Sequence, residues 1–341
     1  MQWMVAIGVD THRDAHVAVA CDRQGRSLGS LQLAATPSGY LKLLDWAQSL
    51  GEPAFAIEGT GSYGRGLARV LEAAGSTVFE CERPRRRDRR RGKSDLIDAT
   101  LAAKRLLTGD GLSRLRGEGG REDLRLLLIE RRSAERARTA ALNQLHAIVI
   151  TAPPRLRARL EPLSGAALAR ACASLRAGAG SDCVLRSVLE RLGKRVLRLA
   201  DELADIEEQL HKLVEELAPA LLAECGVGSF CAAQLLVASG DPTRMRSDAS
   251  FAALAGTSPV DASSGRQQRH RLNRGGDRQL NRALHIITLS RIRYDDATAC
   301  YYARLIATGK TPREARRCIK RALARYFYRR LVAIHALALT P

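Results

Sequence analysis

WMVAIGVD at residues 3–10 is a short apolar run that ends on the carboxylate of Asp10. A run of this length, rich in Val, Ile and Ala, is typical of a buried β-strand. A second run, PAFAIE at residues 53–58, ends in the same way on Glu58. Turn residues follow both runs. The sequence therefore predicts two carboxylates at the ends of two buried strands.

Two further acids, Asp95 and Asp98, lie in the segment GKSDLIDA at residues 92–99. They are three residues apart on a predicted helix, so they share one face of it. Carboxylates from two strand ends and one helix can converge on Mg²⁺, which takes oxygen ligands. Two such ions about 4 Å apart can hold the attacking and leaving oxygens of a phosphodiester. Any one of these acids alone is an ordinary turn residue, but the set predicts a catalytic Mg²⁺ site at Asp10, Glu58, Asp95 and Asp98.

The elements predicted around these acids follow the order β-β-β-α-β-α-β-α. Strands are expected at residues 3–10, 15–21, 27–34, 53–58 and 77–81, and helices at 38–50, 62–74 and 94–108. This order is typical of a ribonuclease-H-like sheet with Asp10 on the first strand and Glu58 on the fourth. We therefore expect an α/β ribonuclease-H-like catalytic domain at residues 1–115.

The charge of the chain indicates a polyanionic partner. It holds 55 Lys+Arg against 36 Asp+Glu, a formal net charge of +19, which is typical of a nucleic-acid-binding protein. Aromatic residues make up only 4% of the chain, which disfavours an extended base-stacking platform. A basic run directly precedes the Asp95 helix, and we expect phosphate contacts from its Arg85, Arg86, Arg87, Arg89 and Arg90.

Residues 116–220 are expected to form a helical segment. Between Leu185 and Leu217, apolar residues alternate spacings of four and three through about five heptads, which predicts a coiled-coil seam. The alternatives are a hairpin within the chain and an amphipathic helix packed on its own domain, whose apolar stripe would be wider. We favour pairing between subunits, which predicts a homo-oligomer, either a dimer or a tetramer.

Residues 221–341 are predicted to form a mainly α-helical domain. It opens with Gly226-Val-Gly228, a turn before a helix that resembles the start of a helix-hairpin-helix module. Further on, Ser263 and Ser264 precede a stretch of cations, from which we expect nucleic-acid contacts at Arg266, Arg269, Arg271 and Arg274. A hydroxyl beside Arg groups suits attack on a phosphodiester, since the Arg groups stabilise charge on its oxygens.

Neither membrane insertion nor secretion is expected. The N-terminus has no charged-then-apolar signal pattern, and no apolar run approaches the length of a membrane span. The eight Cys follow no metal-binding spacing, which suggests reduced thiols. We expect a cytoplasmic protein, associated with the nucleoid when bound to DNA.

Three motifs resemble those of a known family. Asp10-Thr-His-Arg-Asp14, Ile57-Glu-Gly-Thr-Gly-Ser-Tyr63 and Lys93-Ser-Asp-Leu-Ile-Asp-Ala99 are similar to the DEDD motif of bacterial insertion-sequence transposases. That family includes the Piv-type DNA invertases and the recombinases guided by a bridge RNA. Ala255-Gly-Thr-Ser-Pro259, Ser264-Gly265 and the stretch from Arg271 to Leu284 resemble its second domain.

The resemblance implies a RuvC-like domain that holds Mg²⁺ on Asp10, Glu58, Asp95 and Asp98, and a second domain that supplies a nucleophilic serine at Ser264. It implies a DNA transposase or recombinase with a composite site that acts on element ends and target DNA. The partner that selects the DNA is expected to be a guide RNA, and the alternative is that the protein reads DNA directly. The loop between Ser264-Gly265 and Arg271 is short for the family, and the adjacent Ser263 leaves the serine assignment open by one residue.

Two other functions fit parts of the sequence. A Holliday-junction-type nuclease would use the same four acids with water as the nucleophile. A non-catalytic nucleic-acid-binding protein on an ATPase-like fold would use GTGSYGRG at residues 59–66 as its phosphate loop. That stretch lacks the Lys-Ser/Thr ending of a Walker motif.

Overall fold

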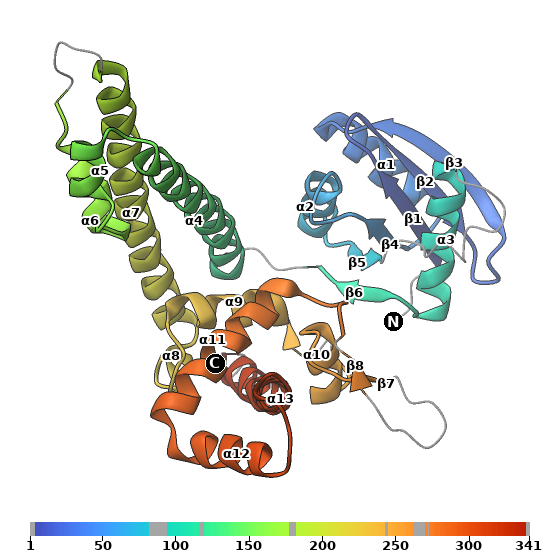
Figure 1. Ribbon diagram of the computed structural model, residues 1–341. Helices are drawn as coiled ribbons and strands as arrows, with labels where there is room; N and C mark the ends of the chain where they lie inside the picture. Colours follow the sequence, from blue (N-terminus) through green and yellow to red (C-terminus); the bar gives the residue numbers. More distant parts are fainter. Residues whose placement is uncertain are drawn as a thin grey trace. The chain divides into compact units, whose positions relative to one another are not determined.

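The computed structural model divides the chain into two compact units, Met1–Arg116 and Gly117–Pro341 (Figure 1). The structure describes residues 4–81, 94–115, 119–176, 182–242, 245–261, 270–271 and 273–338. The first unit is a mixed α/β sheet domain and the second is mainly helical. Among the described residues, no helix combines the length and the apolar character that a membrane span needs.

The first unit is built on a six-stranded sheet in the order β3-β2-β1-β4-β5-β6. Its elements are β1 (Val5–Thr11), β2 (Ala15–Cys21), β3 (Ser27–Ala34), α1 (Pro37–Ser49), β4 (Pro53–Glu58), α2 (Arg65–Ala73), β5 (Thr77–Cys81), α3 (Asp95–Thr108) and β6 (Leu112–Arg114). The strand β4 lies parallel to both β1 and β5, and the other pairs are antiparallel. This arrangement is consistent with the predicted ribonuclease-H-like fold; the short β6 is an addition.

The two faces of the sheet carry side chains of different size. On one face, large residues such as Ile7, Val9, Phe55 and Ile57 form a core with α1 and α2. On the other face, small residues form a second core with α3. This second core includes Ala6, Ala54 and Ala56 from the strands and Ala99, Ala102 and Ala103 from the helix.

Small residues allow α3 to lie directly on the backbone of β1. A Cβ added at Gly8 would overlap the carbonyl oxygen of Ala99 and the amide nitrogen of Ala103. Ser94 caps the start of this helix by accepting a hydrogen bond from the Ile97 amide at 3.3 Å. The first turn of α3, which carries Asp95 and Asp98, is therefore held close to the end of β1.

The second unit contains a long pair of helices, α4 and α7, which run side by side (Figure 1). Its elements are α4 (Gly120–Ile150), α5 (Pro154–Leu160), α6 (Gly165–Ala173), α7 (Cys183–Leu217), α8 (Pro219–Leu222), α9 (Ser229–Ser239), α10 (Asp248–Leu254), β7 (Val260–Asp261), β8 (His270–Arg271), α11 (Arg278–Tyr294), α12 (Asp296–Ala307) and α13 (Pro312–Ala338). Residues 221–261 and 270–338 are mainly helical where the structure describes them, as predicted.

The predicted seam of α7 is covered within the chain. Leu189, Val196 and Leu210 are buried, and α7 packs against α4 and α6. Gly193 permits the contact with α6, since a Cβ there would lie 2.6 Å from the Ala169 carbonyl oxygen. The seam thus forms the hairpin within the chain. Leu192 and Leu203 of the seam are only half-buried, and a coiled coil between subunits remains a prediction.

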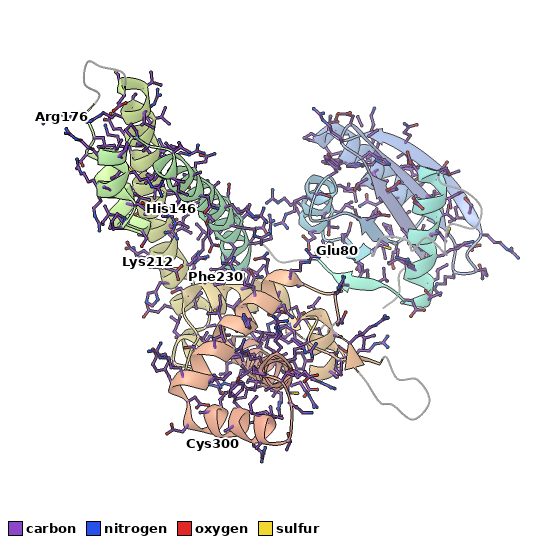
Figure 2. All side chains as sticks on the ribbon, viewed as in Figure 1. Glu80, His146, Arg176, Lys212, Phe230 and Cys300 are labelled. Carbon is purple, nitrogen blue, oxygen red and sulfur yellow. The ribbon has the colours of Figure 1, made fainter. Side chains whose placement is uncertain are left out.

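The helical segment and the C-terminal helices share one core. Leu124 and Leu128 of α4 join Leu210 of α7, Phe251 of α10 and Phe327 of α13 in a single buried cluster. At the edge of this cluster lies Phe230 on α9 (Figure 2), with the guanidinium of Arg131 4.3 Å from the centre of its ring. The predicted boundary at residue 220 therefore lies inside one packed unit.

Replacing Gly8 by Ala should destabilise the protein by about 1–3 kcal/mol, because α3 must move off the sheet to accommodate the methyl group. Urea unfolding followed by circular dichroism measures this change. Gly61→Ala is the matched control, since no heavy atom lies within 4 Å of a Cβ added there. Equal stability of the two variants would contradict the close packing of α3 on β1.

Candidate active site

Asp10 and Glu58 lie next to each other at the ends of parallel strands. Val9 pairs with Ile57 in the β1–β4 register, so Asp10 and Glu58 are the next residues along and face α3 rather than α1 and α2. The two acids are only 7% and 9% exposed. The Thr11 hydroxyl donates a hydrogen bond of 2.6 Å to the Glu58 carbonyl oxygen, which ties the two strand ends together.

The other two acids come from the first turn of α3. Asp98 is 4% exposed and lies on the buried face of the helix with Ala99 and Ala102. Asp95 is one turn earlier, and its side chain is about half exposed. The N-terminal end of a helix stabilises negative charge through its dipole and its unpaired amides. The start of α3 therefore partly offsets the electrostatic repulsion that arises when its two carboxylates lie near the buried carboxylate of Asp10.

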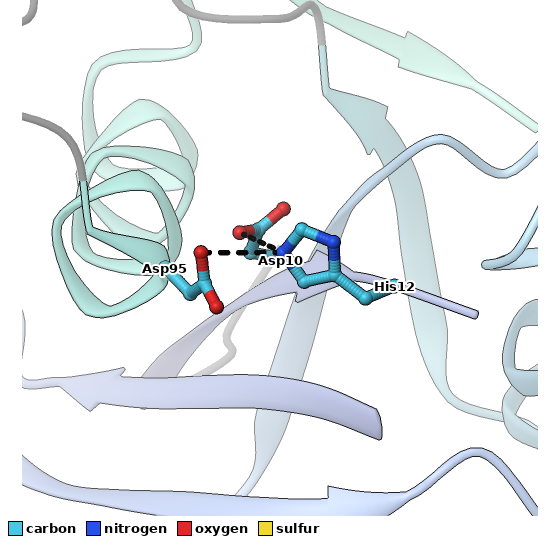
Figure 3. A group of neighbouring side chains, drawn as sticks. All are labelled: Asp10, His12 and Asp95. Atoms are coloured by element: carbon cyan, nitrogen blue, oxygen red, sulfur yellow. Dashed lines mark ion pairs between the residues drawn. The ribbon is translucent and has the colours of Figure 1, made fainter. Parts of the chain in front are cut away.

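A histidine that we did not predict joins this group. His12 Nε2 lies 3.3 Å from Asp10 Oδ2 and 3.2 Å from Asp95 Oδ1 (Figure 3). His12 follows Asp10 by two residues, and residues two apart on an extended chain point to the same side. This spacing was the one signal in the sequence that could have predicted the contact. The turn after β1 fixes its backbone, because the His12 amide donates to the Ala15 carbonyl oxygen at 3.1 Å.

The charges of this group act on one another. Burial is the main cause that raises the pKa of Asp10 above its ordinary value of 3.8. His12 lowers this pKa, whereas the negative charges of Asp95 and Asp98 raise it. Both acids of α3 are thus close enough to interact with Asp10. Without a positive charge between them, these carboxylates repel one another.

The donor atoms fit a divalent cation. One ligand atom from each of Asp10, His12 and Asp95 lies within 4.8 Å of the other two, a spread that one coordination sphere can span. Carboxylate oxygens suit Mg²⁺ and Mn²⁺, whereas an imidazole nitrogen suits softer ions better than Mg²⁺. The geometry therefore supports a cation on the carboxylates and makes His12 the donor that would discriminate between ions.

The glycine-rich loop after Glu58 closes on itself. Its Gly59 carbonyl oxygen accepts hydrogen bonds from the Ser62 amide at 2.9 Å and from the Gly64 amide at 3.1 Å. Gly59 has φ +77°, a backbone conformation that favours glycine. A phosphate loop points its amides at the ligand. Here two amides of the loop donate to a carbonyl oxygen of the same loop instead, which disfavours the ATPase-like alternative.

The other predicted site residues are placed only in part. Arg271 on β8 and Arg274 before α11 are exposed. The strands β7 and β8 pair antiparallel, with Val260 opposite Arg271, and flank the serine segment. Ser263, Ser264, Arg266, Arg269 and the arginines Arg85, Arg86, Arg87, Arg89 and Arg90 lie outside the described residues.

Replacing Asp10 by Asn should raise the melting temperature at pH 7 in the presence of a chelator by a few degrees. The Asp10 pKa is raised in the folded chain, so above that pKa the ionised carboxylate lowers stability, and this penalty disappears as the pH falls toward 3.8. Scanning calorimetry measures the effect. Added Mg²⁺ should stabilise the wild type and not Asp10→Asn.

The control for this experiment is Asp110→Asn, beyond the opposite end of α3, where the side chain is exposed. This variant should behave as the wild type in chelator and in Mg²⁺. A lower melting temperature for Asp10→Asn, or the same response to Mg²⁺ as the wild type, would contradict a cation site at Asp10.

Comparison with known proteins identifies the family. A model of the DEDD transposases named for IS110, described as "Transposase", matches residues 7–153, which include all four acids. A second model, "Transposase IS116/IS110/IS902 family", matches residues 219–303. The chain is 35% identical over 131 residues to an insertion element IS110 uncharacterized 43.6 kDa protein from Streptomyces coelicolor. That match covers 38% of this chain and 32%, about a third, of that protein. The chain belongs to the IS110-type family of DEDD transposases.

Proposed function

We propose that this protein is a DNA transposase that cuts and rejoins DNA strands. The observation that carries the proposal is the convergence of Asp10, His12 and Asp95 beside the buried Asp98. Both family matches, which span the acids and the serine segment, support it. The net charge of +19 suits a nucleic-acid substrate.

The four acids are the residues that would hold the cation, with Mg²⁺ as the first candidate. Bound there, it would polarise the scissile phosphate and offset the charge that develops on its oxygens. Asp10, Glu58 and Asp98 are buried on a rigid sheet and helix, so they would hold its position. Asp95 and His12 are more exposed and lie on the side from which a phosphate can approach.

Ser264 is the proposed nucleophile. Its hydroxyl oxygen attacks phosphorus, a serine–phosphate bond forms, and the bond from phosphorus to the leaving strand oxygen breaks. The proton of the serine passes to the leaving oxygen. The phosphoserine keeps the energy of the broken bond, so attack by a strand hydroxyl can reverse the step and rejoin DNA. Arg271 and Arg274 are exposed cations on the same segment and would bind phosphate.

The partners proposed are DNA, a guide RNA and further copies of the chain. The basic run before α3 supplies cations for a nucleic-acid backbone. A discrete RNA found by sequencing the nucleic acid that co-purifies with the protein would support the guided mechanism. The molar mass of the protein–nucleic-acid complex, measured by light scattering, tests self-association.

Replacing Asp98 by Asn should lower strand cleavage by more than about 100-fold, because losing even an outer-shell partner of a metal ligand typically costs 10–100-fold. Binding should be largely unchanged, since cations contribute most of the affinity for nucleic acid. Gel assays of cleavage and of binding measure both effects. Asp110→Asn should cut DNA like the wild type. Full activity of Asp98→Asn, or of the wild type in excess chelator, refutes the metal site.

Replacing Ser264 by Ala should leave binding intact and remove both cleavage and the covalent protein–DNA adduct, whereas Ser263→Ala should retain them. A denaturing gel of the protein with labelled DNA detects the adduct. An adduct that survives in Ser264→Ala and disappears in Ser263→Ala would assign the nucleophile to Ser263. Cleavage by the wild type without any adduct would favour the water-using junction nuclease.

A further inference from the structure

A hollow of about 470 Å³ adjoins the acids in the first unit. His12 and Asp95 form the wall that it shares with the acidic group. The rest of its lining includes Arg13 from the turn between β1 and β2, Gln32 from β3 and Tyr63 from the loop after β4. Its volume is in the range that small-molecule sites occupy.

The aromatic side of this hollow is held rigidly. Tyr63 is 56% exposed, although its loop is tightly fixed by the bonds to the Gly59 carbonyl oxygen. Gly64, next in the chain, packs so closely that a Cβ there would lie 2.9 Å from Ile57 Cγ2. The Tyr63 ring is therefore presented to solvent from a fixed backbone, which lowers the entropy cost of using it for binding.

The polar side supplies the other groups that a nucleotide needs. The Arg13 side chain is 82% exposed, and its Nε lies 3.8 Å from Oδ1 of Asp14, another residue of the lining. This exposed pair is weak, so the Arg13 guanidinium can exchange it for a phosphate. The Gln32 amide is an exposed donor and acceptor that can bond a base edge. Asp95 connects this surface to Asp10 through His12, at 3.2 and 3.3 Å. A nucleotide in the hollow would thus place its phosphate beside the acidic group.

We propose that the hollow binds one unpaired nucleotide next to the scissile phosphate, with its base stacked on Tyr63 and its phosphate on Arg13. This inference rests on the proposed function, and it specifies that the strand is locally unpaired when it is cut. Tyr63 is the tyrosine among the described lining residues, and a base that stacks on it must leave its own stack to enter the hollow.

Photochemical crosslinking tests the contact without requiring cleavage. The full chain is mixed, in chelator, with a single-stranded oligodeoxynucleotide that carries 5-iodouracil, irradiated, digested and mapped by mass spectrometry. The expected adduct is on Tyr63. Tyr294 in the second unit is the control, since it is 67% exposed and lies outside the hollow. Adducts on Tyr294 or other residues with none on Tyr63 would overturn the proposal.

Cleavage assays test the role of the ring. Tyr63→Ala should lower cleavage about ten- to a hundred-fold, the effect of losing one base stack, while Tyr63→Phe and Tyr294→Ala keep wild-type activity. If Phe does not rescue activity, stacking is not the role of Tyr63. A wild-type protein that cuts no DNA would refute the proposed function. In that case the crosslink to Tyr63 still tests whether the hollow binds a nucleotide. If Tyr63→Ala cleaves DNA at the wild-type rate, the proposed role of the hollow is refuted and the proposed function is not.

Discussion

The contact between α3 and β1 at Gly8 determines where the acidic group forms. Backbone touches backbone there, because Gly8 has no side chain and Ala99 and Ala103 have small ones. Asp10 lies two residues after Gly8, and Asp98 lies one residue before Ala99. Both carboxylates are therefore carried to the edge of the same contact. A larger residue at any of these positions would separate α3 from the sheet and the acids from one another.

This placement has an electrostatic cost. Burial raises the pKa of Asp10, and the charges of Asp95 and Asp98 add to the effect. The start of α3 and the imidazole of His12 each offset part of it. The remaining repulsion suits the group to the proposed cation, since a divalent ion would relieve it. Stability given up at a functional site is typical of enzymes.

Much of the first unit could be predicted, because its strands are apolar runs separated by turns and its acids end two of them. The three-residue β6 carries too little sequence signal, and His12 was missed because only the folded turn brings it to Asp95. In the second unit, periodicity located the apolar stripe of α7 but did not reveal its partner. The structure shows that α6 can pack closely on α7 because Gly193 has no side chain. The start of α11 was hidden in an Arg-rich stretch, although Asp277 caps it.

The acidic group and the net charge of +19 act in opposite directions on DNA, the proposed substrate. A DNA phosphate is attracted to the chain as a whole and repelled by Asp10, Asp95 and Asp98. Affinity for DNA must therefore come from cations outside the acidic group. Among the described residues, Arg13 is the arginine that lines the hollow beside Asp95. The proposed cation would reverse the local repulsion. Binding and chemistry then depend on different residues, so salt should weaken binding without altering the acidic group, which is partly shielded by burial.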